Sequence, residues 1–158
     1  MKPFSILCAA VLALLAASCD RTPGETDGLQ GDTIRLSADR LTFGAGSSTQ
    51  EVTSAGASWT IIEFEENDNI YVTAPETVEY EEYGGYDFEF GHLDGAFCDE
   101  AHPAVTLIRS PWFELHRELR RITVTVASND TGMERSVVFT LEDRDYFGRL
   151  TVVQAAEE

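Results

Sequence analysis

Alternation of apolar and polar residues is the feature that most limits how this chain can fold. Successive side chains of a β-strand point to opposite faces, so apolar residues at every second position mark a strand with one buried face. The pattern is clearest at residues 122–126 and 137–141, and shorter examples occur at residues 34–36, 41–43, 51–54, 58–64 and 150–152. No stretch of ten or more residues has convincing helical periodicity, and the best helical candidate, residues 113–121, fits a strand and its turn at least as well. The sequence therefore predicts an all-β protein.

Polar segments rich in Gly, Ser, Asn and Asp separate the predicted strands. They lie at residues 44–48, 128–132 and 142–145, and these residue types favour turns. Short strands at this spacing predict an antiparallel β-sandwich. Trp59 and Trp112 lie beside strand signals, so we expect both rings to fill the core of the sandwich.

The first eighteen residues have the pattern of an export signal. Lys2 provides a positive start, residues 4–17 are almost entirely apolar, and small residues precede Cys19. The apolar run is too short for a permanent membrane span, which needs about 20 residues. Small residues that end at a cysteine resemble the bacterial lipoprotein signal, which implies that Cys19 is acylated and becomes the first residue of the mature protein. Ordinary secretion, with cleavage after Ala17 or Ser18, is the alternative.

The segment after the signal differs in composition from the rest of the chain. Residues 19–32 are polar and show no periodic apolar residues, so we expect a flexible tether. Residues 33–158 then form the folded domain, and 43% hydrophobic residues in the whole chain are enough for one packed core. If Cys19 carries lipid, Cys98 has no disulfide partner in the mature chain, and we expect it to be a buried thiol rather than a nucleophile.

The charge of the chain excludes a nucleic-acid ligand. Twenty-eight Asp and Glu stand against eleven Lys and Arg, which gives a formal net charge of −17. Removal of residues 1–18 takes away the single lysine and leaves ten arginines against all 28 acids, a net charge of −18. Nucleic-acid-binding proteins bind the phosphates through Lys and Arg, whereas the acidic surface of this protein would repel the phosphates.

Several short motifs together resemble a known domain family. They are Leu41-Thr42-Phe43 before a Gly/Ser turn, Ser58-Trp59-Thr60-Ile61, Pro111-Trp112-Phe113, Ile122-Thr123-Val124, Thr131-Gly132-Met133-Glu134-Arg135 and Leu150-Thr151-Val152-Val153-Gln154. Their order over residues 33–156 resembles the BACON domain, the Bacteroidetes-associated carbohydrate-binding module. The resemblance implies an immunoglobulin-like β-sandwich, lipid-anchored at the outer membrane of the bacterial cell envelope. It implies no catalytic residues.

The chain departs from a short BACON domain between Trp59 and Trp112, where about fifty residues intervene. We expect an acidic, aromatic-rich insert at about residues 65–110, between two strands of the sandwich. Residues 41–108 contain fourteen Asp and Glu and no Lys or Arg, and residues 71–97 hold four of the five tyrosines. Aromatic rings stack on the C–H faces of sugars and carboxylates accept their hydroxyl donors, so this composition suits glycan recognition. A solvated, purely structural insert is the alternative.

Three tyrosines of the insert are the candidate stacking residues: Tyr80, Tyr83 and Tyr86. Tyr86 begins an alternating pattern with Phe88 and Phe90, which favours a half-buried strand. Tyr80 and Tyr83 have no such alternation and are the better candidates for exposure.

Other chemistries have weaker sequence support. Asn67-Asp68-Asn69 offers oxygen ligands for Ca²⁺ but lacks EF-hand spacing. Residues 91–102 contain two His, one Cys and three acids, without a standard zinc spacing. The chain contains no nucleophile-elbow, dinucleotide-binding or Walker motif. We therefore predict no metal, no cofactor and no enzymatic activity.

Two functions remain open from the sequence. The first is a glycan-binding accessory of a polysaccharide-utilisation system, attached to the membrane through its lipid. The second is a structural spacer or a module that contacts another envelope protein. Because a fold does not fix a function, the BACON resemblance does not decide between them.

Overall fold

The computed structural model describes residues 31–75, 83–96, 98 and 103–157. The predicted signal peptide, Cys19, most of the tether and Tyr80 lie outside the described residues. Among the described residues, no helix is long and apolar enough to cross a membrane.

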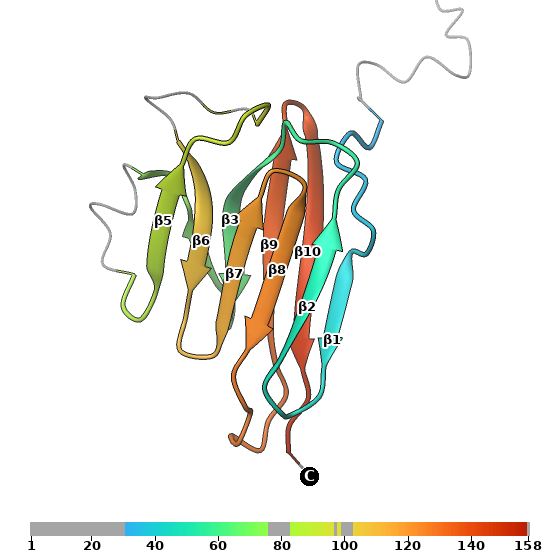
Figure 1. Cartoon of the computed structure of the whole chain (residues 1–158). Coiled ribbons are helices and arrows are strands. Elements are labelled where there is room, and N and C mark those ends of the chain that lie inside the picture. The colour runs from blue at the N-terminus through green and yellow to red at the C-terminus, as the bar shows by residue number, and fades with distance from the viewer. Residues whose placement is uncertain (1–30, 76–82, 97, 99–102, 158) are drawn as a thin grey trace, which may run out of the picture.

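Ten described strands form two five-stranded sheets, which lie face to face (Figure 1). The first sheet has the order β1 (Arg40–Phe43), β10 (Tyr146–Gln154), β9 (Arg135–Asp143), β3 (Thr60–Glu66) and β4 (Asn69–Val72). The second has the order β2 (Ser48–Thr53), β8 (Arg121–Val126), β7 (Phe113–Glu118), β6 (Ala104–Arg109) and β5 (Asp87–Gly91). Every described strand pair is antiparallel except β1 with β10, which is parallel. The predicted β-sandwich is confirmed.

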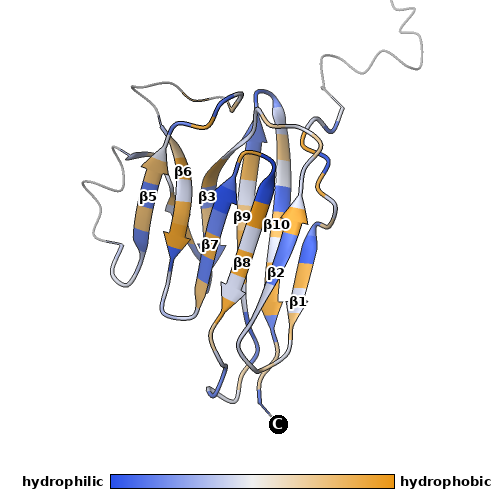
Figure 2. Ribbon diagram, viewed as in Figure 1, coloured by the Kyte–Doolittle hydropathy of each residue, from blue (hydrophilic) through white to orange (hydrophobic). Residues whose placement is uncertain are grey.

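The core lies between the two sheets and is made by the apolar residues that alternate in the sequence. In β8 and β9 every second residue is buried, and the bands of high and low hydropathy along the strands are visible in Figure 2. The rings of Trp59 and Trp112 are both buried, as predicted. Residues 113–121, for which a helix was the alternative, form β7 and the turn that follows it.

The N-terminal part of the domain passes from one sheet to the other. The predicted strand at residues 34–36 is wrong, because only Leu36 forms an isolated bridge, to Ser54 beside β2. Arg35 has a positive φ of 46°, which breaks the extended conformation that a strand needs. The chain then joins the opposite sheet as β1, and this crossing takes Leu36 and Ser37 to the side of β2, away from β10.

The described part of the expected insert contains three strands, β4, β5 and β6. β4 extends the first sheet beyond β3, through a tight turn in which Asn67 and Asp68 have φ values of 51° and 62°. Asn and Asp tolerate this left-handed conformation better than other side chains. β5 and β6 extend the second sheet, and β5 is the half-buried strand that the alternation of Tyr86, Phe88 and Phe90 predicts. The two added edges lie on the same side of the sandwich.

Candidate functional site

The described tyrosines of the insert lie in a cluster of aromatic rings that faces the core. Tyr83 and Tyr86 are half-buried. The Tyr86 ring lies 4.7 Å from that of Tyr71 and 5.0 Å from that of Phe64, measured between centroids. Tyr83 meets Tyr71 edge-on at 5.3 Å. Both tyrosines are therefore engaged in packing, and their role as stacking residues for a sugar stays a prediction.

The polar end of this cluster is the carboxylate of Glu66, at the end of β3. The Tyr86 hydroxyl donates a hydrogen bond to one oxygen of Glu66, and Nε1 of Trp112 donates to the other at 2.6 Å. Burial, and then the neighbouring Glu66 carboxylate, raise the pKa of Tyr86 well above its ordinary value. These two hydrogen bonds to Glu66 hold the insert against the rest of the sandwich.

The described residues of the 91–102 group lie at the end of β5 and on the segment after it, whereas Asp99, Glu100 and His102 lie outside the described residues. The candidate Ca²⁺ ligands Asn67, Asp68 and Asn69 lie at the turn between β3 and β4. Cys98 is half-buried rather than fully buried, and it forms no disulfide with a described residue. Its Sγ lies 3.9 Å from Nδ1 of His92, and Nε2 of His92 lies 3.6 Å from the exposed carboxylate of Asp94. Among the described residues, no three metal-binding side chains come together.

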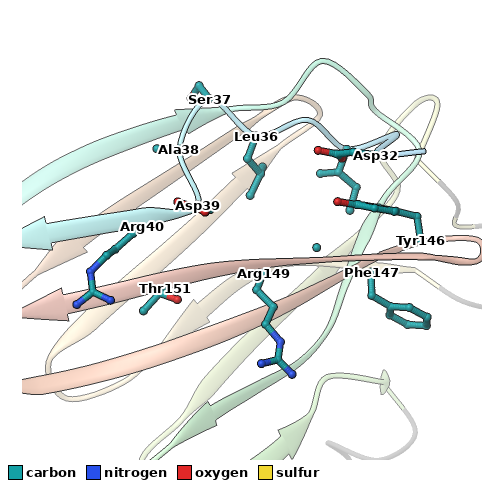
Figure 3. A pocket seen from close by; sticks show the side chains of 12 residues that line it. Asp32, Leu36, Ser37, Ala38, Asp39, Arg40, Tyr146, Phe147, Arg149 and Thr151 are labelled. Carbon is teal, nitrogen blue, oxygen red and sulfur yellow. The ribbon is translucent and has the colours of Figure 1, made fainter. Parts of the chain in front are cut away.

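An open groove of about 650 Å³ lies at the edge of the first sheet, between β10 and the segment that crosses between the sheets (Figure 3). The sequence did not predict it. Its lining residues are Asp32, Ile34, Leu36, Ser37, Ala38, Asp39, Arg40, Tyr146, Phe147, Gly148, Arg149 and Thr151. The groove exists because β1 pairs with β10 only from Thr151 onward, while Leu36 and Ser37 bond to residues beside β2 in the other sheet.

The edge of β10 that faces this groove pairs with no described strand before Thr151. The N–H of Thr151 donates to the carbonyl of Asp39 at 2.8 Å, so it points toward β1. Because alternate residues of a strand direct their N–H and C=O to the same edge, those of Phe147 and Arg149 point into the groove. They meet no backbone partner among the described residues. The groove therefore offers main-chain donors and acceptors to a ligand.

The side chains of the groove combine rings with charges. Phe147 is 57% exposed. Figure 3 shows Phe147 and Arg149 leaving β10 on one side, while Tyr146 points back toward Asp32. Burial, followed by the charge of Asp32, raises the pKa of Tyr146. Arg40 and Arg149 share the outer face of the sheet, since Arg40 pairs with Thr151, two residues after Arg149.

One sequence signal points to this groove. Tyr146-Phe147-Gly148-Arg149 places two aromatic residues and an arginine together in a chain with few cations. Their partners Asp32 and Arg40 are distant in the sequence, so no local motif unites them.

Comparisons with known proteins address only the fold. No family model matches the chain, and no curated protein matches it. A solved structure described as "NMR structure of the protein from Bacteroides thetaiotaomicron" is similar, with a TM-score of 0.53 and 18% sequence identity. The match covers 84% of this chain and 94% of that chain. At this identity the likeness shows a shared fold and nothing of the ligand.

Proposed function

We propose that this protein is a non-catalytic, glycan-binding accessory module, held at the outer membrane of the cell envelope by a lipid on Cys19. The groove beside β10 is the observation that carries the proposal. It places the exposed ring of Phe147 next to unpaired main-chain groups, two arginines and two aspartates. Sugars present C–H faces to aromatic rings and hydroxyls to polar groups, so one shallow groove with both kinds of partner suits them.

The open shape of the groove also favours binding over catalysis. Enzymes that cleave glycans exclude water from the reacting bond and hold two carboxyl groups across it. Here Asp32 accepts a hydrogen bond of 2.7 Å from the backbone of Arg35, and its charge acts on Tyr146. Asp32 therefore positions the N-terminal segment, and the groove remains a surface for an extended ligand.

The proposal includes the assignment of the sandwich to the immunoglobulin-like BACON type. The motifs of residues 33–156 support it, and so does the way in which the first segment changes sheets before β1 joins β10. The predicted lipoprotein signal supports the location.

A panel of immobilised neutral and acidic glycans tests the proposal, with the exported protein carrying Cys19→Ser to keep it in solution. We expect binding to at least one glycan and a loss of about fivefold in Phe147→Ala, since an aromatic contact contributes about 1 kcal/mol. Met133→Ala is the matched control, because Met133 is 71% exposed on a loop at the other end of β9. Absence of binding to every glycan would overturn the proposal.

A second candidate function, docking of another envelope protein, rests on a different surface. Ile70 and Val72 of edge strand β4 are 63% and 40% exposed. Aliphatic side chains on an open sheet edge suit a protein partner better than a sugar. Ile70→Lys should abolish the capture of such a partner and leave glycan binding unchanged.

A further inference from the structure

We propose that the groove beside β10 selects acidic glycans, those that carry uronate or sulfate groups. This inference rests on the glycan-binding function proposed above and names the class of its ligand. It is carried by the positions of the arginines that form no ion pair with any described residue of this acidic chain.

Most of the arginines away from the groove are already engaged. Arg109 and Arg121 each pair with a glutamate of the second sheet, at 2.8 and 2.9 Å. Arg117 is buried against Trp59, and Arg135 donates to the Gln154 side chain and to main-chain carbonyls. These arginines already have partners in the folded protein, so their charge is less available to an anion than that of an arginine without a partner.

The two arginines of the groove are exposed and have no ion-pair partner among the described residues. Arg40 pairs with Thr151, two residues after Arg149, so Arg40 and Arg149 lie on neighbouring strands and on the same face of the sheet. Their side chains can therefore approach one acidic sugar together. A guanidinium binds carboxylate or sulfate oxygens through two parallel hydrogen bonds, which a neutral sugar cannot form as strongly.

Two further arginines lie on the segments that lead into the groove. Arg35 precedes the crossing segment, and Arg144 lies in the turn before β10. Arg35 and Arg144 add positive charge on the segments before β1 and before β10, in a chain whose mature form carries an excess of eighteen negative charges.

The excess negative charge of the chain limits where an acidic glycan can bind. An acidic glycan is repelled by most of the surface, but physiological salt screens charges beyond about 8 Å. It can therefore bind where Arg40 and Arg149 lie, because their charges locally offset those of Asp32 and Asp39. Asp39 and the free main-chain groups of Phe147 and Arg149 are then left to bond sugar hydroxyls.

Calorimetric titration of the exported Cys19→Ser protein tests the inference. The probes are a galacturonate hexasaccharide, a sulfated chondroitin hexasaccharide, a neutral maltohexaose and a glutamate hexapeptide. The variants are Arg40→Gln and Arg149→Gln. Arg120→Gln is the matched control, because Arg120 is exposed, has no ion-pair partner among the described residues and lies beside β2 and β8, so its loss changes the net charge equally.

We expect an acidic hexasaccharide to bind at least tenfold more tightly than maltohexaose. Arg40→Gln and Arg149→Gln should each weaken it about tenfold or more, and Arg120→Gln should leave it unchanged. Equal binding of maltohexaose, with no effect of either variant, would overturn the inference and leave the glycan-binding function intact. Failure of all three glycans to bind would overturn both. Equal, arginine-dependent binding of the glutamate peptide would overturn the sugar assignment and indicate a protein ligand.

Discussion

The indole N–H of Trp112 donates a hydrogen bond of 2.6 Å to the Glu66 carboxylate, which joins the two sheets of the sandwich. Glu66 ends β3 in the first sheet, and Trp112 lies in the turn before β7 in the second. The Tyr86 hydroxyl donates to the other oxygen of the same carboxylate. One buried side chain, 8% exposed, therefore holds both sheets and the start of β5.

The first prediction concerns this bridge. Glu66→Ala leaves the Trp112 N–H and the Tyr86 hydroxyl without an acceptor, so the free energy of unfolding should fall by about 2–4 kcal/mol. Glu66→Gln keeps one acceptor oxygen and should lose less than half as much. Urea denaturation measures both variants. A loss below about 0.5 kcal/mol in Glu66→Ala would show that the bridge does not stabilise the sandwich.

The second prediction concerns alkaline pH. The folded state raises the pKa of Tyr86 above the value of about 10 that tyrosine has in an unfolded chain. The resulting stability is complete below pH 10 and is lost as the pH rises further, because the unfolded state then releases a proton that the folded state keeps. Stability should therefore fall more steeply above pH 10 in the wild type than in Tyr86→Phe. The difference should stay below about 1.4 kcal/mol per pH unit, since the hydroxyl is partly solvated.

Tyr83→Phe makes the same chemical change without removing the hydrogen bond to Glu66. It should retain the wild-type slope above pH 10. If Tyr86→Phe and the wild type have equal slopes, the Tyr86 hydroxyl does not stay protonated in the folded state.

The third prediction concerns Arg117, a buried cation on β7 that is 1% exposed. Its guanidinium lies 3.9 Å above the Trp59 ring and donates to the Trp59 carbonyl, but Nε and Nη1 have no hydrogen-bond partner among the described residues. Burial lowers the pKa of Arg117 to about 10. Arg117→Met keeps the aliphatic stem and removes the desolvated charge, so the protein should be at least as stable at neutral pH.

Comparison of Arg117→Ala with Arg117→Met separates the contribution of side-chain packing to stability from that of the charge. Arg117→Ala also removes the stem that covers Trp59, and it should therefore cost about 2–3 kcal/mol. Thermal denaturation compares the two variants. An equal loss in Arg117→Met and Arg117→Ala would mean that the buried charge itself stabilises the fold.

The strands that the sequence predicted best are those with one buried face. In residues 122–126 and 137–141 every second residue is apolar and buried, and β8 and β9 lie there. The pattern did not identify β6, because Ala104, Val105, Leu107 and Ile108 are all buried and only Thr106 separates them, so apolar and polar residues do not alternate. The predicted strand at residues 34–36 failed because a local left-handed residue, Arg35, interrupts the extended chain.

The candidate site was harder to predict from the sequence than the fold. The alternation of Tyr86, Phe88 and Phe90 correctly indicated β5, but the sequence could not show that the Tyr86 hydroxyl donates a hydrogen bond to Glu66. The groove depends on the parallel pairing of β1 with β10, which brings Arg40 beside Thr151. Local periodicity carries no information about such a contact between the two ends of the domain.

The fourth prediction concerns the membrane anchor. Cys19→Ser should release the protein from the membrane fraction, because acyl chains supply about 0.8 kcal/mol per buried CH₂ and the acidic mature chain has no lysine to hold anionic lipids. Cys98→Ser is the control and should stay in the membrane fraction. Unchanged fractionation of Cys19→Ser would contradict a lipid anchor at this position.

Amide chemical-shift mapping of the isotope-labelled, exported Cys19→Ser protein tests the central claim most directly. On titration with the galacturonate hexasaccharide, the largest changes should occur at Arg40, Phe147 and Arg149, whose side chains and main-chain groups line the groove. The amides of residues 83–91, in the insert, should not move. Changes centred on residues 83–91, or no changes with any of the glycans, would contradict a glycan site beside β10.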